Sequence, residues 1–257
     1  VKTANTQPAI LTASVACYEI LKEKGFTPDI VGGHSLGEYS ALVAAGVLDF
    51  KDAVYVVHKR GEYMQEAVPL GEGSMAAILA LPREEVVRIC EEVNDTVGSV
   101  QAVNFNCPGQ IVIAGATKAV EVAAEKMKEA GAKRAVMLPV SAPFHSRLME
   151  PAAKRLQEEL DKIEVKDAQI PVVANITGEI LHDGAAIKEA LVTQAAAPVL
   201  WEDCVATMVD FGATRFVEVG PGKVLTGFTK KINKAMELAN VEDEASLASA
   251  IAFLQGE

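Results

Sequence analysis

The chain has 257 residues, of which 50% are hydrophobic and 23% charged, so it can bury a sizeable core in one or two domains. Asp and Glu outnumber Lys and Arg by 35 to 24, and the resulting net charge of -11 argues against nucleic acid and anionic membranes as partners. No apolar run approaches the roughly 18 residues of a membrane span, and four scattered cysteines without a CxxC pair favour a reducing cytoplasm over a disulfide framework or zinc site.

Residues 1–70 predict a helix, a strand, a tight turn and two further helices. Apolar spacing and the glycine and proline breaks indicate helices over 5–25, 39–45 and 49–66 and a strand over 30–31. Asp49 and Asp52 resemble a capping box at the start of the third helix, with Asp in place of the usual Glu or Gln. The strand runs directly into the turn at 32–37 and then into a helix.

In residues 71–139 the order of predicted elements changes to a β-α-β-β-α-β unit. Strands are expected over 74–81, 100–105, 110–114 and 133–138, with one helix over 82–93 and a second that ends at Gly131. This order is that of the ferredoxin-like arrangement. Because the alternation of the first part resumes afterwards, we interpret 71–139 as an inserted ferredoxin-like subdomain and 1–70 with 140–257 as the core domain.

The remainder of the chain returns to alternating helices and strands. Helices are predicted over 149–163, 185–194 and 201–211, and strands over 170–175 and 215–219. Such alternation favours a parallel sheet with helices on both faces. The predicted fold class is therefore α/β, with an α/β-hydrolase-like parallel-sheet core that carries the smaller subdomain.

Residues 33–37 read Gly-His-Ser-Leu-Gly, a G-x-S-x-G sequence between an apolar strand and a helix. In this context the glycines leave room for a strained turn that lifts the hydroxyl of Ser35 above the sheet. The backbone N–H of Leu36, at the start of the following helix, is the expected donor to an oxyanion. The alternative is a glycine-rich turn in which Ser35 is merely structural.

A nucleophilic Ser needs a base, and the chain offers four histidines. His34 is expected to point away from Ser35, His58 lies in a predicted helix, and His182 lies in a surface turn. His145 is the best candidate, because it lies between a strand and a helix at the sheet end where sites collect. No acidic residue between Ser35 and His145 is well placed as a third member, which predicts a Ser–His dyad whose His is oriented by backbone carbonyl groups.

Arg60 lies on the apolar face of the third predicted helix, together with Ala53, Val57 and Met64. An Arg on such a face needs a carboxylate or phosphate partner. That partner is a substrate group or a Glu of the protein, unless the side chain extends to solvent. The residues alone leave these possibilities open.

Four motifs occur in one order along the chain: GGHSLGE at 32–38, RGEYMQEA at 60–67, PFHS at 143–146 and EVGPGKVL at 218–225. With VNFN at 103–106 and PGQ at 108–110, they closely resemble the malonyl-CoA:acyl-carrier-protein transacylases of bacterial fatty-acid synthesis. The likeness extends from Asn5 to about Lys231.

The resemblance implies transfer of a malonyl group from malonyl-CoA to the phosphopantetheine thiol of acyl carrier protein through a malonyl-serine on Ser35, in a ping-pong cycle. His145 would take the proton, the main-chain carbonyl of Gln194 would orient His145, and Arg60 would hold the malonyl carboxylate. Bulk at Phe144 would crowd a methyl branch of the substrate. The other implied substrate-binding residues are His34, Met64 and Asn104. No cofactor or metal is implied, and a cytoplasmic monomer is expected.

The resemblance also exposes a departure and leaves alternatives. Members of the family begin with a strand and a loop close to Gly-Gln-Gly-Ser-Gln, whose first Gln supplies a second oxyanion N–H. The sequence lacks this segment, so a fragment of a longer chain, or a piece supplied from elsewhere, is expected. The alternatives are an acyltransferase domain of a polyketide or multidomain fatty-acid synthase, a serine hydrolase, and an inactive module that binds carrier protein. Basic side chains expected at the docking surface are Lys133, Arg134, Lys223, Lys230 and Lys231.

Overall fold

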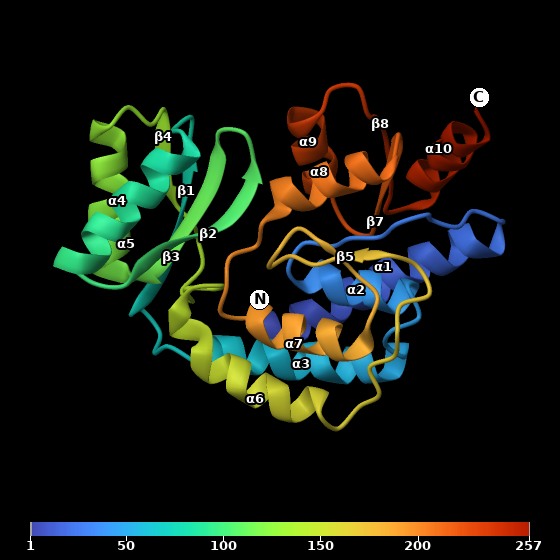
Figure 1. Cartoon of the computed structure of the whole chain (residues 1–257), viewed down its shortest axis with the longest axis horizontal. Helices are drawn as coiled ribbons and strands as arrows, with labels where there is room; N and C mark the ends of the chain where they lie inside the picture. The colour runs from blue at the N-terminus through green and yellow to red at the C-terminus, as the bar shows by residue number, and fades with distance from the viewer. Residues whose placement is uncertain (1, 257) are drawn as a thin grey trace.

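The computed structural model describes residues 2–256, which form two lobes of unequal size (Figure 1). The smaller lobe contains β1 (Gly73–Leu79), α4 (Arg83–Thr96), β2 (Val100–Cys107), β3 (Gln110–Ala116), α5 (Thr117–Glu129) and β4 (Arg134–Met137). The larger lobe contains α1 (Thr3–Glu23), α2 (Leu36–Ala44), α3 (Phe50–Glu66), η1 (Arg147–Met149), α6 (Glu150–Leu160), β5 (Val172–Val173), β6 (Ile180–Leu181), α7 (Gly184–Gln194), α8 (Trp201–Phe211), β7 (Arg215–Val219), α9 (Val224–Ile232), β8 (Glu237–Val241) and α10 (Glu244–Gln255).

The strands of the smaller lobe form one antiparallel sheet in the order β2-β3-β1-β4. Its side chains alternate between two faces, as the two-residue period of a β-strand requires. Ile78 and Ile113 pack on one face with α4 and α5, whereas Met75 and Val112 lie on the other face with Phe144. This strand order, with both helices on one face, confirms the predicted ferredoxin-like arrangement.

The larger lobe contains the parallel strand pairs. Val31 pairs with Val172 of β5, and β7 pairs with β8 along its whole length, whereas β6 is antiparallel to β5. Helices and strands alternate along this part of the chain, so the predicted α/β class is confirmed. The domain boundaries at 70/71 and 139/140 stay a prediction. Within residues 2–256, no helix combines the length and apolar character that a membrane crossing needs.

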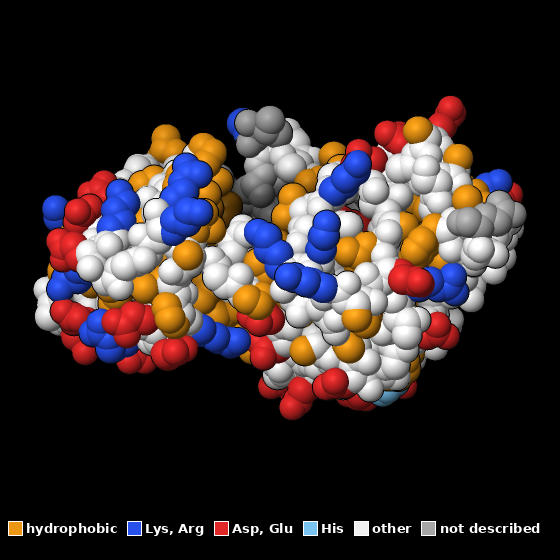
Figure 2. Space-filling model, turned by 90° about the horizontal axis from the view of Figure 1, so that it is seen from above, with side chains coloured by type: hydrophobic (Ala, Val, Ile, Leu, Met, Phe, Trp, Pro, Cys, Tyr) orange, Lys and Arg blue, Asp and Glu red, His pale blue; other side chains and the backbone are white. Residues whose placement is uncertain are grey.

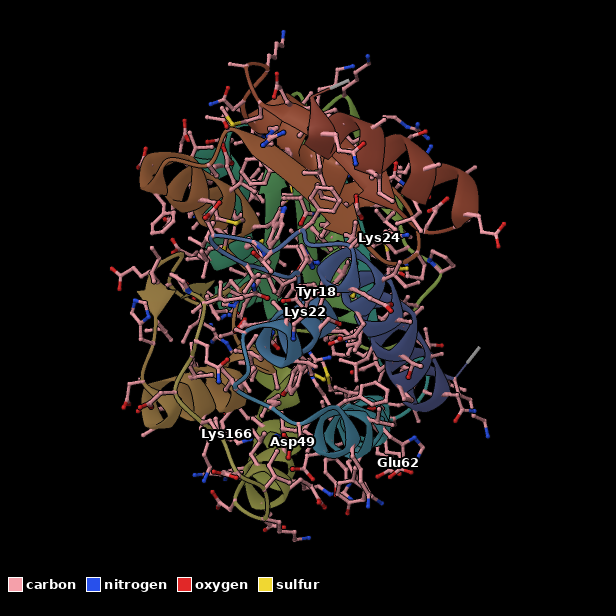
Figure 3. All side chains as sticks on the ribbon, turned by 90° about the vertical axis from the view of Figure 1, so that its right-hand side faces the viewer. Tyr18, Lys22, Lys24, Asp49, Glu62 and Lys166 are labelled. Atoms are coloured by element: carbon pink, nitrogen blue, oxygen red, sulfur yellow. The ribbon has the colours of Figure 1, made fainter. Side chains whose placement is uncertain are left out.

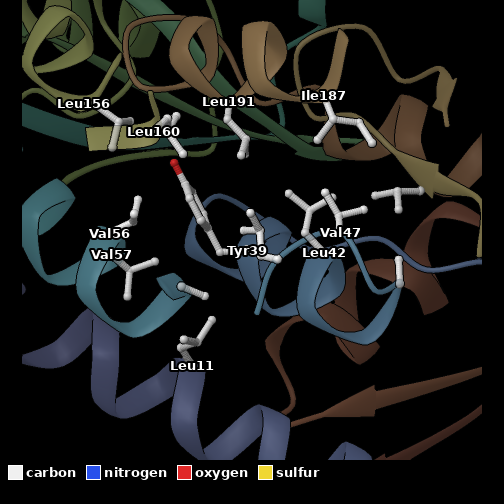
Figure 4. Close-up of a cluster of buried hydrophobic side chains, with 14 of the residues drawn as sticks. Leu11, Tyr39, Leu42, Val47, Val56, Val57, Leu156, Leu160, Ile187 and Leu191 are labelled. Carbon is white, nitrogen blue, oxygen red and sulfur yellow. The ribbon is translucent and has the colours of Figure 1, made fainter. Parts of the chain in front are cut away.

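A large cluster of buried apolar side chains packs α2 against four other helices (Figure 4). Each labelled member is at most 3% exposed, and full burial of such a side chain contributes about 1.5–3 kcal/mol. The members are Leu11 of α1, Tyr39 and Leu42 of α2, Val47 between α2 and α3, Val56 and Val57 of α3, Leu156 and Leu160 of α6, and Ile187 and Leu191 of α7. This packing fixes α2, and with it the turn that precedes α2.

Two local predictions differ from the structure. Asp49 is the N-cap residue of α3, but its side chain makes no capping hydrogen bond. Its Oδ1 accepts instead from Nζ of Lys166 at 3.2 Å, at the surface shown in Figure 3. The strand predicted over 170–175 is limited to Val172–Val173, because the main chain of Asn175 bonds to groups outside the sheet.

The elements after residue 222 were not predicted from the sequence, although a signal for the last helix is present. Asp243 and Ser246 form a capping box at the start of α10, in which each side chain accepts a hydrogen bond from the other residue's backbone N–H. Ser in place of Glu or Gln at the third position hides this signature in a search for the usual pattern.

Candidate active site

Ser35 occupies a strained turn between the Val31 pairing and α2. Its φ of 56° and ψ of -111° are rare for residues other than glycine. A Cβ atom at Gly33 would lie 1.9 Å from the carbonyl oxygen of Gly37, so only glycine fits there, whereas a Cβ at Gly37 would meet open space. The N–H of Leu36 donates to no acceptor within residues 2–256, which leaves it available to an anion.

Ser35 and His145 form a hydrogen-bonded pair. The hydroxyl oxygen of Ser35 lies 2.7 Å from Nε2 of His145, and Nδ1 of His145 lies 2.8 Å from the main-chain oxygen of Gln194. Because a carbonyl oxygen can only accept, Nδ1 carries the proton and Nε2 offers its lone pair to the hydroxyl. This is the geometry of a nucleophile, a base and a group that orients the base.

The route of the chain to His145 differs from the prediction. The preceding strand, β4, belongs to the antiparallel sheet of the smaller lobe and not to the end of a parallel core sheet. Residues 138–144 then leave that sheet, and Pro143 lies against Gly73, where a Cβ would approach the proline ring to 2.4 Å. The smaller lobe therefore anchors the loop that carries the base.

Arg60 is 2% exposed and lies beside Ser35. Its Nη2 donates to the hydroxyl of Ser35 at 3.0 Å and to Oε1 of Gln194 at 2.8 Å, and its Nη1 donates to Oε1 of Gln7 at 2.7 Å. Its Nε is buried without an acceptor. The salt bridges among residues 2–256 do not include Arg60, so the partners of this buried cation are all neutral.

A cavity of about 260 Å³ opens at Ser35. Eight of the nine site residues predicted from the sequence line it: His34, Ser35, Leu36, Arg60, Met64, Asn104, Phe144 and His145. The ninth, Gln194, is fully buried and contacts both His145 and Arg60. The Oδ1 of Asn104 is buried without a hydrogen-bond partner, so it is an unused acceptor in the wall of the cavity.

Sequence reasoning missed several residues at the site. Thr3, Gln7 and Met75 also line the cavity, and Glu38 and Asn175 lie behind the turn. Gln7 reaches Arg60 because α1 crosses α3 closely at Gly61, where a Cβ would lie 2.7 Å from Ala4. A glycine inside a helix is the sequence signal for such a crossing.

Several buried groups near Ser35 have shifted pKa values, and burial is the largest cause for each. Burial, followed by the positive charge of Arg60, lowers the pKa of His145 from 6.5 to about 3. His145 therefore stays neutral, and able to accept a proton, throughout the neutral range. Burial raises the pKa of Glu38 from 4.5 to about 7, against the opposing effects of hydrogen bonds from Asn175 and Gln194 and of the positive charge of Arg60.

The raised pKa of Glu38 predicts a pH-dependent stability. A carboxyl with a higher pKa in the folded state stabilises the fold below its unfolded pKa, and this contribution is lost as the pH rises through about 7. Glu38→Gln removes the titration. The free energy of unfolding of the variant, relative to wild type, should therefore be about 2 kcal/mol higher at about pH 7.5 than at about pH 5. Urea unfolding of both proteins at both pH values measures this, and an unchanged difference would contradict it.

The α/β fold, the strained serine turn, the Ser–His pair and the buried Arg60 define an acyltransferase of the serine-nucleophile class. Residues 1–251 match the family model described as acyl transferase domain. The chain is also 52% identical over 255 residues to the malonyl CoA-acyl carrier protein transacylase of Bacillus subtilis (strain 168), covering 99% of this chain and 80% of that protein. The chain therefore belongs to the acyl transferase domain family, among the malonyl CoA-acyl carrier protein transacylases.

Solved structures agree with this assignment. An acyl-carrier-protein S-malonyltransferase from Burkholderia pseudomallei 1710b is 52% identical, with a TM-score of 0.94, over 97% of this chain and 81% of that chain. A malonyl-transacylase in complex with a type II polyketide acyl-carrier protein is 49% identical, with a TM-score of 0.95, over 100% of this chain and 82% of that chain. The predicted family resemblance is confirmed.

Proposed function

We propose that the chain transfers a malonyl group from malonyl-CoA to the phosphopantetheine thiol of acyl carrier protein and so supplies extender units for fatty-acid synthesis. The observation that carries this proposal is the buried guanidinium of Arg60, which lies beside the Ser35 hydroxyl with neutral partners only. A buried charge without a directly bonded counter-charge costs several kcal/mol, and the carboxyl of Glu38 acts on Arg60 through space without forming a salt bridge. An acyl group that ends in a carboxylate supplies the missing charge within reach of the nucleophile.

In the first half-reaction, the Ser35 oxygen attacks the thioester carbonyl while Nε2 of His145 takes the hydroxyl proton. The Leu36 N–H stabilises the oxyanion that forms. The carbon–sulfur bond then breaks, and His145 gives its proton to the departing CoA sulfur. The products are malonyl-Ser35 and CoA with a free thiol.

The second half-reaction runs the same steps on a different thiol. His145 takes the proton of the phosphopantetheine thiol, the sulfur attacks the ester carbonyl, and the ester carbon–oxygen bond breaks. The Ser35 oxygen regains the proton from His145. Because the acyl group arrives as an activated thioester and the protein's own side chains supply nucleophile and base, we infer that the reaction needs no cofactor. The four free cysteines support the reducing cytoplasm as its location.

Phe144 supports selection of an unbranched malonyl group. Its side chain lies in the cavity wall with Met64 and Met75, on the side formed by the smaller lobe and α3. A methyl branch on the substrate would need space that these side chains fill, and overpacking of this kind costs about 1–3 kcal/mol.

Intact mass spectrometry tests the proposal. Brief exposure to malonyl-CoA should add one malonyl group to the protein, and added carrier protein should remove it and gain the same mass. Release of free malonate without carrier protein would instead identify a serine hydrolase. Absence of any adduct on the folded protein would contradict the proposed nucleophile.

Arg60→Met is expected to lower kcat/KM for malonyl-CoA by about 100- to 1000-fold, because it removes the buried partner of the carboxylate. The rate with acetyl-CoA, which carries no carboxylate, should change by less than about tenfold. Lys59→Met is the matched control, since Lys59 lies next along α3 and pairs with Glu62 at the surface. Equal losses with both substrates would show that Arg60 acts on Ser35 alone.

Basic side chains on the face seen in Figure 2 offer a docking surface for an acidic carrier protein. Lys230 and Lys231 are exposed in the last turn of α9, which packs beside β2 of the smaller lobe. Reversing both charges to Glu should raise the KM for carrier protein about tenfold and leave malonyl-Ser35 formation unchanged. Reversal of Lys22 and Lys24, exposed on another side (Figure 3), is the control. An unchanged KM would place docking elsewhere.

A further inference from the structure

Asn175 follows β5 and is fully buried. Its main chain leaves the sheet: the N–H donates to Oε2 of Glu38 at 3.1 Å, and the carbonyl oxygen accepts from the N–H of Leu200 at 2.8 Å. The main chain of Asn175 therefore cannot continue the parallel pairing that Val31 begins.

The side chain of Asn175 makes the hydrogen bonds that its main chain does not. The N–H of Val31 donates to the carbonyl of Pro171, and the carbonyl of Val31 accepts from the N–H of Val173. In that parallel register, the next bond would join the N–H of Gly33 to the carbonyl of Val173, and the described residues do not form it. The two bonds after it would join the N–H of residue 175 to the carbonyl of residue 33, and the carbonyl of residue 175 to the N–H of residue 35.

In the structure the carboxamide of Asn175 makes both bonds. Its Nδ2 donates to the carbonyl of Gly33 at 2.7 Å, and its Oδ1 accepts from the N–H of Ser35 at 2.8 Å. The carboxamide thus extends the parallel ladder across the turn, on both sides of His34. Asn alone has this length with both a donor and an acceptor, because Asp lacks the donor and Gln is one methylene longer.

The same carboxamide links the nucleophile to the support of the base. Oδ1 of Asn175 also accepts from Nε2 of Gln194 at 3.2 Å, and the main-chain oxygen of Gln194 orients His145. The φ of 56° at Ser35 is a conformation that the surrounding structure has to hold. Asn175 bonds to the main chain just before the Cα of Ser35, and Gln194, which it contacts, donates to the main-chain oxygen just after it.

We propose that Asn175 is the positioning residue of the nucleophile turn: its carboxamide takes the place of main chain in the ladder and holds Ser35 and the Leu36 N–H in the reactive geometry. This inference rests on the proposed function, since it assigns Asn175 to the acylation of Ser35. It predicts an effect on the chemical step, because Asn175 does not line the cavity in which substrate binds.

The test is the rate constant for acylation of Ser35 by malonyl-CoA, measured by rapid mixing. The same experiment gives the fraction of protein molecules that become acylated, which is the fraction of active sites. Asn175→Ala should lower the rate constant about 10- to 100-fold per active site, while the apparent Kd for malonyl-CoA changes less than twofold. A purely structural role would lower the fraction of active sites and leave the rate constant of the remaining ones unchanged. That result would overturn the proposal.

Two further variants keep the test decisive. Asn94→Ala makes the same substitution in the smaller lobe, where the carboxamide oxygen also accepts from a main-chain N–H, that of Val100 at 3.2 Å, and its acylation rate constant should match wild type. If Asn175→Ala does not fold, Asn175→Asp keeps the acceptor for the Ser35 N–H and replaces the donor to Gly33 by a carboxylate oxygen, which repels the Gly33 carbonyl. Its rate constant should fall about tenfold, and a wild-type value would overturn the proposal. Absence of an adduct on wild type would refute the proposed function, a separate outcome.

Discussion

Ser35→Ala is expected to abolish the malonyl adduct and to lower transfer to carrier protein by roughly 10⁴- to 10⁶-fold. The variant loses the oxygen that forms the covalent intermediate, and His145 and Arg60 each lose one hydrogen-bond partner. Both keep other partners, so the fold should survive. Intact mass after exposure to malonyl-CoA, followed by a transfer assay, measures the loss.

Ser40→Ala is the matched control for this loss. Ser40 lies on α2, five positions further along the chain, and its hydroxyl is buried without a hydrogen-bond partner. The control therefore removes the same atom from the same helix region without breaking a bond, and both adduct and transfer should match wild type. An adduct that persists in Ser35→Ala would locate the nucleophile elsewhere.

The parts of the fold that the sequence predicted are those in which local pattern and tertiary packing agree. In the smaller lobe, alternating residues such as Met75 and Ala76 face opposite sides of the sheet, and that period is visible in the sequence. On α3, the predicted apolar face that includes Ala53 and Val57 is fully buried. Short strands such as β5 gave no usable pattern, since pairing partners distant in the chain decide where they end.

The residues of the candidate site likewise differ in how far the sequence predicts them. Ser35 and its turn carry a local signature, because the glycine at 33 is required by a contact only four residues away. His145 was found by elimination among four histidines, and Arg60 because a charge on an apolar face needs an explanation. For Gln194, the main-chain contact with His145 that the family resemblance implied is present in the structure.

Gln7 and Asn175 could not have been found in this way. Each reaches the site through a close approach of distant segments: Gln7 through the crossing of α1 and α3, and Asn175 through the end of the pairing between Val31 and β5. An isolated Gln in a helix or Asn after a strand is ordinary in sequence. Their importance comes from the atoms that surround them, which local spacing does not encode.

The buried polar groups behind Ser35 form one connected network. Gln194 donates to the main-chain oxygen of Ser35 and accepts from Arg60, while Asn175 bonds to Gln194 and Glu38. In a low-dielectric interior such a network is rigid when its members are satisfied. The nucleophile, the base and the cation that faces the cavity therefore share one supporting network. A substitution at one of them should shift the side-chain positions of the others.

His145→Ala is expected to lower acylation by about 10⁴-fold, because the Ser35 hydroxyl then lacks a base. The wild-type rate should show no titration of His145 in the neutral range, since the pKa of His145 is lowered to about 3. In the variant, hydroxide has to take the proton, so the residual rate should rise about tenfold per pH unit. Acylation rates across the neutral and mildly alkaline range measure both effects.

The double variant Ser35→Ala/His145→Ala should be no slower than Ser35→Ala alone, because a nucleophile and its base act as one unit. His58→Ala is the control: His58 lies on α3, bonds to Glu62 and the carbonyl of Ala4, and is remote from Ser35 in the hydrogen-bond pattern. If His145→Ala kept a pH-independent rate within about tenfold of wild type, another group would be the base. Nε2 of His145 lies against the Ser35 hydroxyl as the proton acceptor. In His145→Ala, the acylation rate and its pH dependence should therefore both change.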